Sequence, residues 1–202
     1  MYIPKAFVQE DEEKIHSLVD AHAFGLLVTT GRDGLPVASH IPFLSREAGD
    51  SPVLEGHVAR PNDQADHILD GAPALAVFQG AHTYVSPTWY ESPGVPTWNY
   101  EAVHVYGRLR EVAGDGAHSI IRRLARRFEG DGPGAWVPAY PDRMIEGIVC
   151  FEMTDVTVQA KSKMSQNRSK ADRRGVIEAL FRLDDPGSRA VGRIMQDNEA
   201  GS

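Results

Sequence analysis

A single stretch of the chain combines a strand pattern with unusual chemistry, and it reads Val95-Pro96-Thr97-Trp98-Asn99-Tyr100-Glu101-Ala102-Val103-His104-Val105-Tyr106-Gly107-Arg108-Leu109. From Ala102 onward, apolar residues alternate with a second set that contains His104, Tyr106 and Arg108, which is the period-2 pattern of a half-buried strand. That second face is too polar to pack in an ordinary hydrophobic core. The pattern leaves two interpretations open: an edge strand capped by aromatic side chains, or one wall of a cofactor or ligand pocket.

Several other segments carry strand patterns, and most of them are joined by short turns. The clearest pair, 24–30 and 35–44, flanks the hairpin signal Gly31-Arg32-Asp33-Gly34. The further predicted strands are 53–59, 74–79, 83–85, 148–153 and 156–161, and the polar segment 45–52 is predicted to be a loop. With only two or three solid helices, of which 117–129 is the clearest, about eight strands predict an antiparallel β-barrel with helices packed outside it. The expected fold class is therefore α+β and mainly β.

A length of 202 residues suits one domain with a real core and at most a small appendage. We expect residues 1–165 to form the barrel domain and residues 166–202 to form a helical tail packed on it. Residues 161–182 contain seven Lys or Arg and two Asp or Glu, and the two amphipathic pieces of the tail could form a helix-turn-helix. Because the turn at Asp184-Asp185 is acidic, direct DNA binding is the less favoured interpretation.

The overall composition excludes several classes of protein. A formal net charge of −7 argues against general affinity for nucleic acids. The single cysteine, Cys150, excludes an intramolecular disulfide framework and a Cys-x-x-Cys-His heme attachment site. No apolar segment reaches membrane-spanning length and the N-terminus lacks a signal-peptide core, so we expect a soluble cytoplasmic protein with no membrane partner. Walker, dinucleotide-binding and His-Glu-x-x-His motifs are absent, and the eight histidines lack zinc-site spacing.

The predicted strand 53–59 contains a histidine whose orientation follows from alternation. Leu54 and Val58 lie on the apolar side of this strand, so His57 must project from the opposite side, outward from the barrel. That opposite side is neither very polar nor very apolar, which is typical of a dimer interface or of a ligand site at such an interface. The pattern therefore predicts a homodimer.

The remaining candidates for a functional site are three strand histidines (His40, His57 and His104), a cluster of aromatic residues, and a tail rich in Lys, Arg, Ser and Asn. This combination fits a planar anionic cofactor. Flavin mononucleotide (FMN) offers a phosphate and a flat ring, whereas heme offers two propionates, a flat macrocycle and an iron that binds imidazole. His104 lies beside Tyr106 and Arg108, a setting suited to hydrogen bonding a substrate.

Several motifs resemble the PaiB family over residues 1 to about 180. They are Met1-Tyr2-Ile3-Pro4-Lys5, Gly56-His57-Val58-Ala59-Arg60, Phe78-Gln79-Gly80, Tyr84-Val85-Ser86-Pro87-Thr88-Trp89-Tyr90, Val95-Pro96-Thr97-Trp98-Asn99-Tyr100 with Val103-His104, and Met164-Ser165-Gln166-Asn167-Arg168. PaiB-like proteins are described as FMN-binding negative transcriptional regulators. The resemblance implies the FMN-binding split β-barrel, with antiparallel strands and peripheral helices, and a homodimer whose cofactor sites lie at the subunit interface.

One departure from the family pattern favours a subgroup. Where members commonly continue Gly-His-x-Ala into Asn-Pro-x-Trp, this chain has Asn62-Asp63-Gln64-Ala65 and lacks the proline and the indole. The piperazate synthases, which resemble PaiB, bind heme b and close δ-N-hydroxy-L-ornithine into piperazic acid by forming an N–N bond. Loss of a tryptophan beside His57 would make room for a macrocycle or a small amino-acid substrate. We therefore place the heme enzyme ahead of the alternative, an FMN-binding regulator or FMN-dependent oxidoreductase.

The resemblance also implies roles for individual residues. The expected cofactor-binding residues are His57, Arg60, Trp98, Asn99, Tyr100, Lys163, Ser165 and Arg168. His57 is the expected iron ligand, ahead of His40 and His104. Lys163 and Arg168 would pair with the heme propionates, or with the flavin phosphate in the alternative. His104 and Tyr106 are the candidate catalytic residues, because the attacking α-amine must stay unprotonated.

Overall fold

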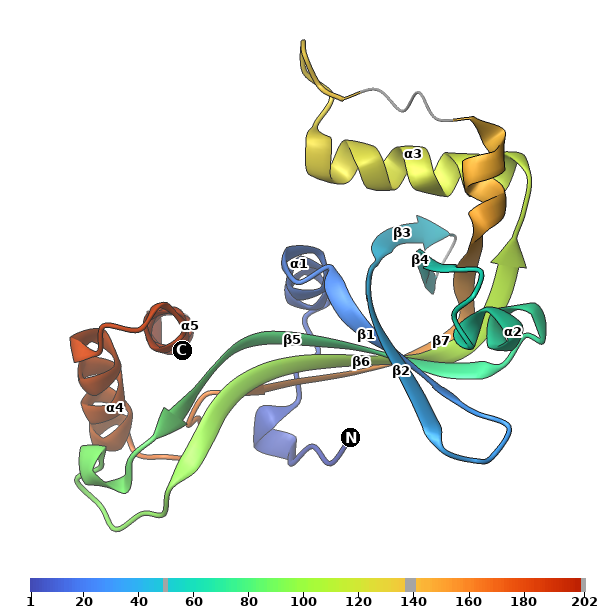
Figure 1. Cartoon of the computed structure of the whole chain (residues 1–202). Coiled ribbons are helices and arrows are strands. Elements are labelled where there is room, and N and C mark those ends of the chain that lie inside the picture. The colour runs from blue at the N-terminus through green and yellow to red at the C-terminus, as the bar shows by residue number, and fades with distance from the viewer. Residues whose placement is uncertain (49–50, 137–140, 201–202) are drawn as a thin grey trace. The chain divides into compact units, whose positions relative to one another are not determined.

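A computed structural model describes residues 1–48, 51–136 and 141–200, and these residues form a seven-stranded antiparallel sheet and five α-helices (Figure 1). The sheet order is β2-β1-β5-β6-β7-β4-β3. The strands are β1 (Phe24–Thr30), β2 (Pro36–Pro42), β3 (Leu44–Ala48), β4 (Ser51–Ala59), β5 (Pro73–Val85), β6 (Thr97–Val112) and β7 (Ile148–Lys163). The helices are α1 (Glu12–Ala21), α2 (Gln64–Leu69), α3 (Asp115–Glu129), α4 (Lys170–Arg182) and α5 (Pro186–Ala200), with 3-10 turns η1 (Lys5–Phe7), η2 (Pro87–Trp89) and η3 (Asp142–Gly147). The predicted α+β class is confirmed.

The chain divides into two compact units, and neither is a continuous piece of sequence. Unit 1 comprises Met1–Leu18, Gln79–Val103 and Gln159–Ser202, whereas unit 2 comprises Val19–Phe78 and His104–Val158. Strands β5, β6 and β7 are long enough to contribute residues to both units. None of the described helices combines the length and the apolar character that crossing a membrane would need.

The core of unit 2 is built on three phenylalanines that are almost completely buried. Phe43 meets Phe78 and Phe151 edge to face, with ring centroids 5.2 Å and 6.2 Å away. Gly56 of β4 lies against this cluster, and a Cβ at that position would stand 2.9 Å from the Phe151 ring. The close approach of β4 to β7 therefore requires glycine at position 56.

The strand predictions were wrong about continuity at three places. Residues 74–79 and 83–85 belong to one strand, β5, and residues 148–153 and 156–161 belong to one strand, β7. The alternation within β7 is interrupted at Asp155, whose φ of 51° is unusual for a residue other than glycine, yet pairing continues past it. Residues 35–44 were predicted to form one strand but belong to two, because β2 ends at Pro42 and β3 begins at Leu44.

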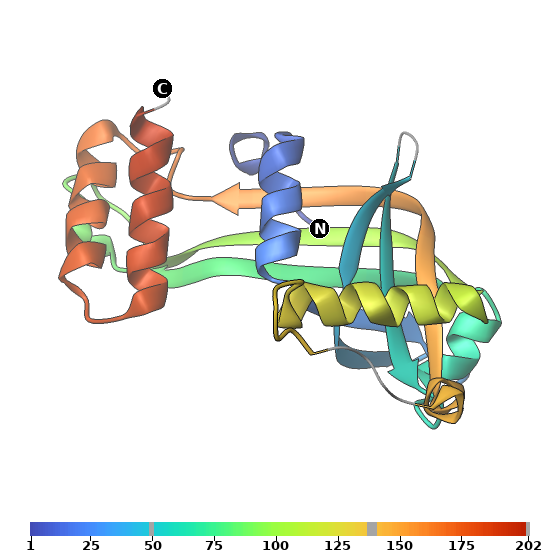
Figure 2. The same ribbon diagram turned by 90° about the horizontal axis from the view of Figure 1, so that it is seen from above.

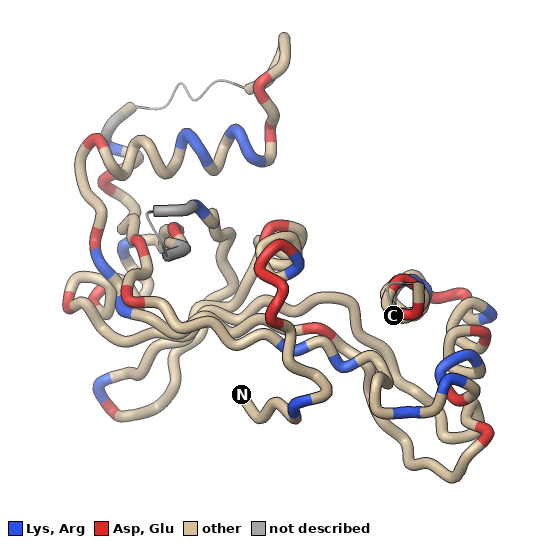
Figure 3. Tube along the Cα trace, turned by 180° about the vertical axis from the view of Figure 1, so that it is seen from behind, with Lys and Arg blue, Asp and Glu red and all other residues tan. Residues whose placement is uncertain are grey.

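Strand β3 also corrects the prediction that residues 45–52 form a loop, although residues 49 and 50 lie outside the described part of the chain. Arg46 of β3 donates hydrogen bonds to Glu55 (2.6 Å) and to Glu152 (3.2 Å), which lie opposite each other on β4 and β7. Arg123 of α3 also pairs with Glu55, and Arg110 of β6 pairs with Glu152. Both glutamates are buried, so this network of two carboxylates and three guanidiniums fastens α3 to the sheet. Figure 3 shows the basic residues along α3.

In unit 1, helices α4 and α5 lie side by side at the C-terminal end of the chain (Figures 1 and 2). They share a buried apolar cluster, whose members are Val85, Met164, Val176, Ile177, Leu180, Val191 and Met195. Asp172 in the first turn of α4 accepts hydrogen bonds from the backbone amides of Glu91 and Ser92 and from the Ser92 hydroxyl. These bonds, from Ser92 above all, lower the pKa of Asp172 to about 2.

Gly175 of α4 offers a test of how closely this helix packs on η2. A Cβ at Gly175 would collide with the carbonyl oxygen of Trp89, so Gly175→Ala must displace the helix. The gain in helix propensity, about 1 kcal/mol, opposes an overpacking cost of roughly 1–3 kcal/mol or more, and we expect net destabilisation in thermal melting. Gly192→Ala in α5 is the matched control, because its Cβ would have ordinary contacts beginning at 3.4 Å. Equal melting temperatures for the two variants would contradict this packing.

Candidate functional site

His57 lies on β4, on the side that alternation predicts. Leu54 and Val58 are buried on the core side, whereas Glu55 projects toward α3 and pairs with Arg123 of that helix. His57 shares the α3 side with Glu55 and lines a pocket there. Because α3 covers this side of the strand, β4 does not present the broad open face on which the prediction of a dimer was based.

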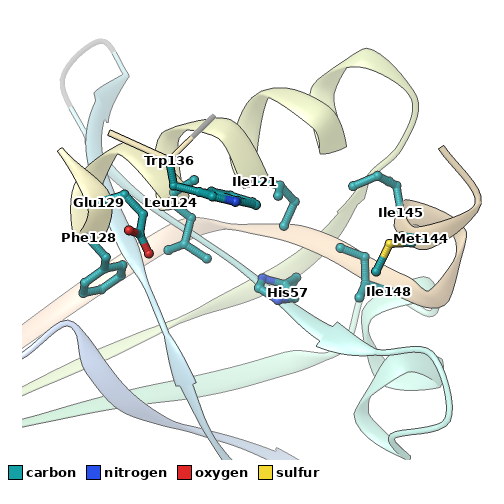
Figure 4. A pocket seen from close by; sticks show the side chains of 10 residues that line it. His57, Ile121, Leu124, Phe128, Glu129, Trp136, Met144, Ile145 and Ile148 are labelled. Atoms are coloured by element: carbon teal, nitrogen blue, oxygen red, sulfur yellow. The ribbon is translucent and has the colours of Figure 1, made fainter. Parts of the chain in front are cut away.

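The pocket has a volume of about 360 Å³, and Figure 4 shows the His57 ring pointing into the space between β4 and α3. Its remaining walls come from α3, the following loop, η3 and the start of β7, and they are Ile121, Leu124, Ala125, Phe128, Glu129, Trp136, Met144, Ile145 and Ile148. Apart from His57 and Glu129 these side chains are apolar or aromatic. Phe128, Trp136 and Met144 are each more than half exposed, at 61%, 53% and 60%, so the pocket opens to solvent through an apolar rim.

The His57 imidazole has an unusual environment. Its Nδ1 atom is buried and has no hydrogen-bond partner among the described residues. Burial also lowers the pKa of His57 below its ordinary value, because the charged imidazolium would lose its hydration. His57 is therefore a neutral imidazole at neutral pH, which is the form that binds a metal.

The walls of the pocket suit the apolar faces of a planar group. In the described part of the chain, no group of three or more His, Cys, Asp or Glu side chains is gathered to hold a bare metal ion. Heme needs only one protein ligand, and its macrocycle suits apolar walls such as these. A flavin phosphate and the two heme propionates alike require cationic partners, and the pocket walls contain no Lys or Arg.

Arg60 lies beside this pocket but not among its walls. Its guanidinium donates to the carbonyl oxygens of Glu146 (2.7 Å) and Ile148 (3.2 Å). These two carbonyls flank the junction between η3 and β7, where one wall of the pocket begins. Arg60 therefore holds that wall in place, and its charge has no carboxylate partner in the described contacts.

A second group of predicted residues lies in unit 1 and is cationic and aromatic. Lys163 donates to the Thr97 hydroxyl (2.6 Å) and to the carbonyl oxygen of Trp98 (2.5 Å), and Arg168 lies 4.4 Å from the centre of the Tyr90 ring. Burial, together with the like charges of Lys161 and Arg168, lowers the pKa of Lys163. The described partners of Lys163 and Arg168 are all neutral groups, so the cluster is suited to an anion.

Four other predicted residues of unit 1, two of them buried and two aromatic, lie in different surroundings. Asn99 and Ser165 are buried and bind each other, with the Asn99 amide 3.0 Å from the Ser165 hydroxyl. Trp98 is 53% exposed and packs against Tyr84, whereas Tyr100 receives the ammonium of Lys161 at 5.0 Å from its ring centre. Asn99 and Ser165 therefore join β6 to the segment after β7 instead of opening to a cavity.

The candidate catalytic residues, His104 and Tyr106, lie together on β6 in unit 2. The His104 Nδ1 atom is 3.5 Å from the Tyr106 hydroxyl, and partial burial is the main cause of a lowered His104 pKa. Neither residue is among the walls of the His57 pocket. The structure thus places His104 and Tyr106 beside each other but does not bring them into that pocket.

The segment from Asn62 to Ala65 contributes no wall of the His57 pocket. Asn62 accepts a hydrogen bond from the backbone amide of Gln64, which begins α2, and the buried Gln64 amide reaches Leu27 and Thr29 of β1. Ala65 is 3% exposed and is not a pocket wall. Ala65 itself therefore adds no space beside His57, and the effect of the missing tryptophan on that space stays a prediction.

Sequence reasoning missed most of the pocket walls. Helix α3 has an apolar stripe, and the structure divides that stripe between the core and the pocket. Ile120 is buried against Cys150, whereas Ile121 and Phe128 face the pocket. Two features of the sequence could have indicated these walls. One is the width of the apolar stripe of α3, and the other is the apolar pair Met144 and Ile145 in the segment that becomes η3.

Comparison with known proteins identifies relatives that span nearly the whole chain. Residues 1–160 match the family described as "Putative FMN-binding domain". The protease synthase and sporulation protein PAI 2 (PaiB) of Bacillus subtilis (strain 168) is 35% identical over 202 residues, covering 98% of this chain and 97% of that protein.

Solved structures with the same fold include two whose names mention flavin or heme. The FAD and heme binding protein from Mycobacterium smegmatis has a TM-score of 0.61 at 22% identity, covering 77% of this chain and 72% of its own. The flavocytochrome Anf3 from Azotobacter vinelandii also has a TM-score of 0.61, at 14% identity, covering 91% of this chain and 74% of its own. At these identities the likeness establishes the split-barrel fold.

Proposed function

Because this chain belongs to the family described as "Putative FMN-binding domain", as its PaiB-like motifs predicted, we propose that it is a cofactor-dependent split-barrel protein whose His57 pocket holds heme b. The single observation that carries the proposal is a neutral histidine whose ring points into an apolar pocket. The names of the two structural neighbours add support, since each refers to a heme or flavin protein of this fold.

The proposed reaction is closure of δ-N-hydroxy-L-ornithine to piperazic acid. Heme b, when bound, supplies a Lewis-acidic iron that weakens the N–O bond of the hydroxylamine. As the N–N bond forms, the N–O bond breaks, and the departing hydroxide takes a proton from the attacking amine and leaves as water. The reaction therefore consumes no oxidant or reductant.

The residues of this pocket would contribute binding, orientation and a low dielectric. His57 would hold the heme iron as a neutral ligand. The side chains of Ile121, Leu124 and Ile148 exclude water, which disfavours the protonated form of the α-amine that must attack. Glu129 is the only carboxylate among the walls, and it can pair with a cationic group of an amino-acid substrate.

A second candidate, FMN binding, is favoured by the cationic cluster of unit 1. Lys163 and Arg168 could pair with the phosphate, and the exposed Trp98 ring could stack on the flavin. The family description and the relationship to PaiB support this candidate, in which the protein is a flavin-binding regulator or oxidoreductase.

The absorption spectrum of the purified protein distinguishes the two candidates. Expression with adequate heme should give a red protein with a Soret band, from which mass spectrometry identifies extracted heme b. Incubation with δ-N-hydroxy-L-ornithine should then yield piperazic acid. A yellow protein that releases only FMN would overturn the heme proposal in favour of the second candidate.

We also propose that the protein forms a homodimer through the outer side of β1 and β5. Leu26 and Val28 pair with Val77 and Leu75 across these strands, and all four are only half-buried although their neighbours fill the core. Phe24, at the start of β1, is 67% exposed. A second copy of the chain would bury this apolar strip by two-fold symmetry.

Light scattering tests the dimer. The wild-type mass should be twice the 22.1 kDa of one chain, and Phe24→Asp should shift it toward the monomer, because a charge would be buried in the interface. Leu35→Asp is the control, since Leu35 is similarly exposed, at 63%, but lies in the hairpin turn. A wild-type mass of 22.1 kDa at working concentration would contradict the proposal.

A further inference from the structure

A second cavity lies within unit 1 and shares no wall with the His57 pocket. Its walls come from the N-terminal segment, the end of β7 and the helices α4 and α5. The volume of this unit 1 cavity is about 400 Å³, which is within the range of roughly 300–1,000 Å³ that sites for small molecules occupy. The walls include neither Lys163 nor Arg168, the cations that could pair with a flavin phosphate.

The buried walls of the unit 1 cavity are two methionines and a serine. Met164 and Met195 are each 2% exposed, and both belong to the apolar cluster that α4 and α5 share. The Ser162 hydroxyl donates to the carboxylate of Glu101 (3.0 Å). Because Ser162 and Lys163 are consecutive in β7, they project to opposite sides of the strand. The cavity is therefore on the other side of β7 from the Lys163 ammonium.

An ion pair between the two helices forms a further part of the walls. Arg173 of α4 donates through Nε to Glu199 of α5 (3.0 Å) and through Nη1 to the carbonyl oxygen of Arg168 (2.8 Å). Within the described part of the chain, no contact occupies the Nη2 of Arg173 or the Oε2 of Glu199. The pair therefore retains one charged donor and one charged acceptor for a ligand.

Lys14 and Asp197 add one more charge of each sign. Lys14 of α1 meets Asp11 only at 3.9 Å, and Asp197 is exposed and has no partner among the described residues. The described walls of the cavity thus contain two cations and two carboxylates, and none of these walls is an aromatic ring.

This balance of charges determines which class of ligand fits. Because like charges repel, the two carboxylates disfavour a simple anion and the two cations disfavour a simple cation. A nucleotide is a poor match, because its phosphates would meet two carboxylates and its base would find no ring on which to stack. A zwitterion presents one charge of each sign and can pair with both kinds of side chain at once.

We propose that the unit 1 cavity binds a free α-amino acid with an apolar side chain. The carboxylate of the ligand pairs with Arg173, and its ammonium pairs with Glu199 and Asp197. Its side chain lies against the thioethers of Met164 and Met195, which adapt to apolar groups of different shapes. This binding does not depend on what the His57 pocket holds.

Isothermal titration of the full chain with L-leucine tests the proposal, and two derivatives of leucine test the pairing of charges. L-Leucine should show saturable binding. N-Acetyl-L-leucine lacks the ammonium and L-leucinamide lacks the carboxylate, so each should bind roughly 10-fold more weakly or worse, because each loses a charge-assisted hydrogen bond. Equal affinities for all three compounds, or no saturable binding of L-leucine at millimolar concentration, would overturn the proposal.

A pair of matched variants locates the ligand. Asp197→Asn breaks no described contact, so its thermal melting should match that of the wild type while its affinity for L-leucine falls roughly 10-fold. Glu178→Gln is the control, because Glu178 is also exposed and without a described partner but is not a wall of the cavity. The same affinity in Asp197→Asn and Glu178→Gln would contradict the proposal.

The His57 pocket needs a separate control, because its proposed substrate is also an amino acid. His57→Ala should bind L-leucine as tightly as the wild type does, since His57 is not a wall of the unit 1 cavity. Loss of L-leucine binding in a folded His57→Ala protein would place the ligand in the His57 pocket and overturn the proposal.

Discussion

Replacing His57 with alanine is expected to abolish heme retention while leaving the chain folded. His57 would be the only protein ligand to the iron, so its loss should weaken heme binding by more than the roughly 10–100-fold that removal of a supporting hydrogen bond costs. In the unliganded protein the ring has a buried nitrogen without a partner. An unsatisfied buried polar group costs about 1–3 kcal/mol of stability. Because His57→Ala removes this group, it should regain part of the stability that is lost with the packing contacts of the ring. Heme titration and urea unfolding of the same samples measure both effects.

The controls for this prediction are the other strand histidines. His104→Ala should retain heme, because His104 is not a wall of the pocket, and a loss of turnover alone would support the predicted catalytic role of His104. His40 stacks on the exposed Phe24 ring, and His40→Ala should also retain heme. An unchanged Soret band in His57→Ala would disprove the assignment, and His40 would then be the next ligand to test.

Removal of the Glu55 carboxylate should produce the largest loss of stability. Glu55→Ala leaves Arg123 without its carboxylate and leaves Arg46 with Glu152 alone, at a site where the Glu55 side chain is only 4% exposed. Breaking a buried ion pair costs roughly 3–5 kcal/mol, and we expect about 3 kcal/mol, because both arginines are about 40% exposed and remain partly hydrated. The same change loosens α3, which forms one wall of the pocket, so heme affinity should also fall.

Urea unfolding with a surface ion pair as the control isolates this effect. Arg32 and Asp66 lie 3.5 Å apart with side chains 84% and 66% exposed, so Asp66→Ala should cost less than about 1 kcal/mol. A Glu55→Ala protein as stable as Asp66→Ala would show that the buried network contributes little.

The sequence predicted the fold class and the orientation of His57 because both depend on local periodicity. Alternation correctly placed Leu54 and Val58 in the core and His57 on the opposite side. It failed at Asp155, because a single residue with positive φ interrupts the pattern without ending the hydrogen-bonded ladder.

The rest of the site could not be predicted, because it depends on which distant segments meet. Asn99 was predicted to contact a cofactor from its position in a specific motif, yet its partner, Ser165, is far along the chain. Likewise, Met144 and Phe128 become pocket walls only because α3 and η3 pack beside β4. Neither relationship produces a pattern within any one segment.

The interrupted composition of the two units constrains how the chain can fold on the ribosome. Unit 2 lacks part of its sheet until residue 158 has been synthesised, and unit 1 needs the last segment, which begins at Gln159. A nascent chain that has emerged as far as Val112 therefore exposes apolar strands whose partner, β7, does not yet exist. Early stalling of translation, or truncation anywhere before α4, should expose the chain to chaperones and proteases instead of yielding a smaller stable protein.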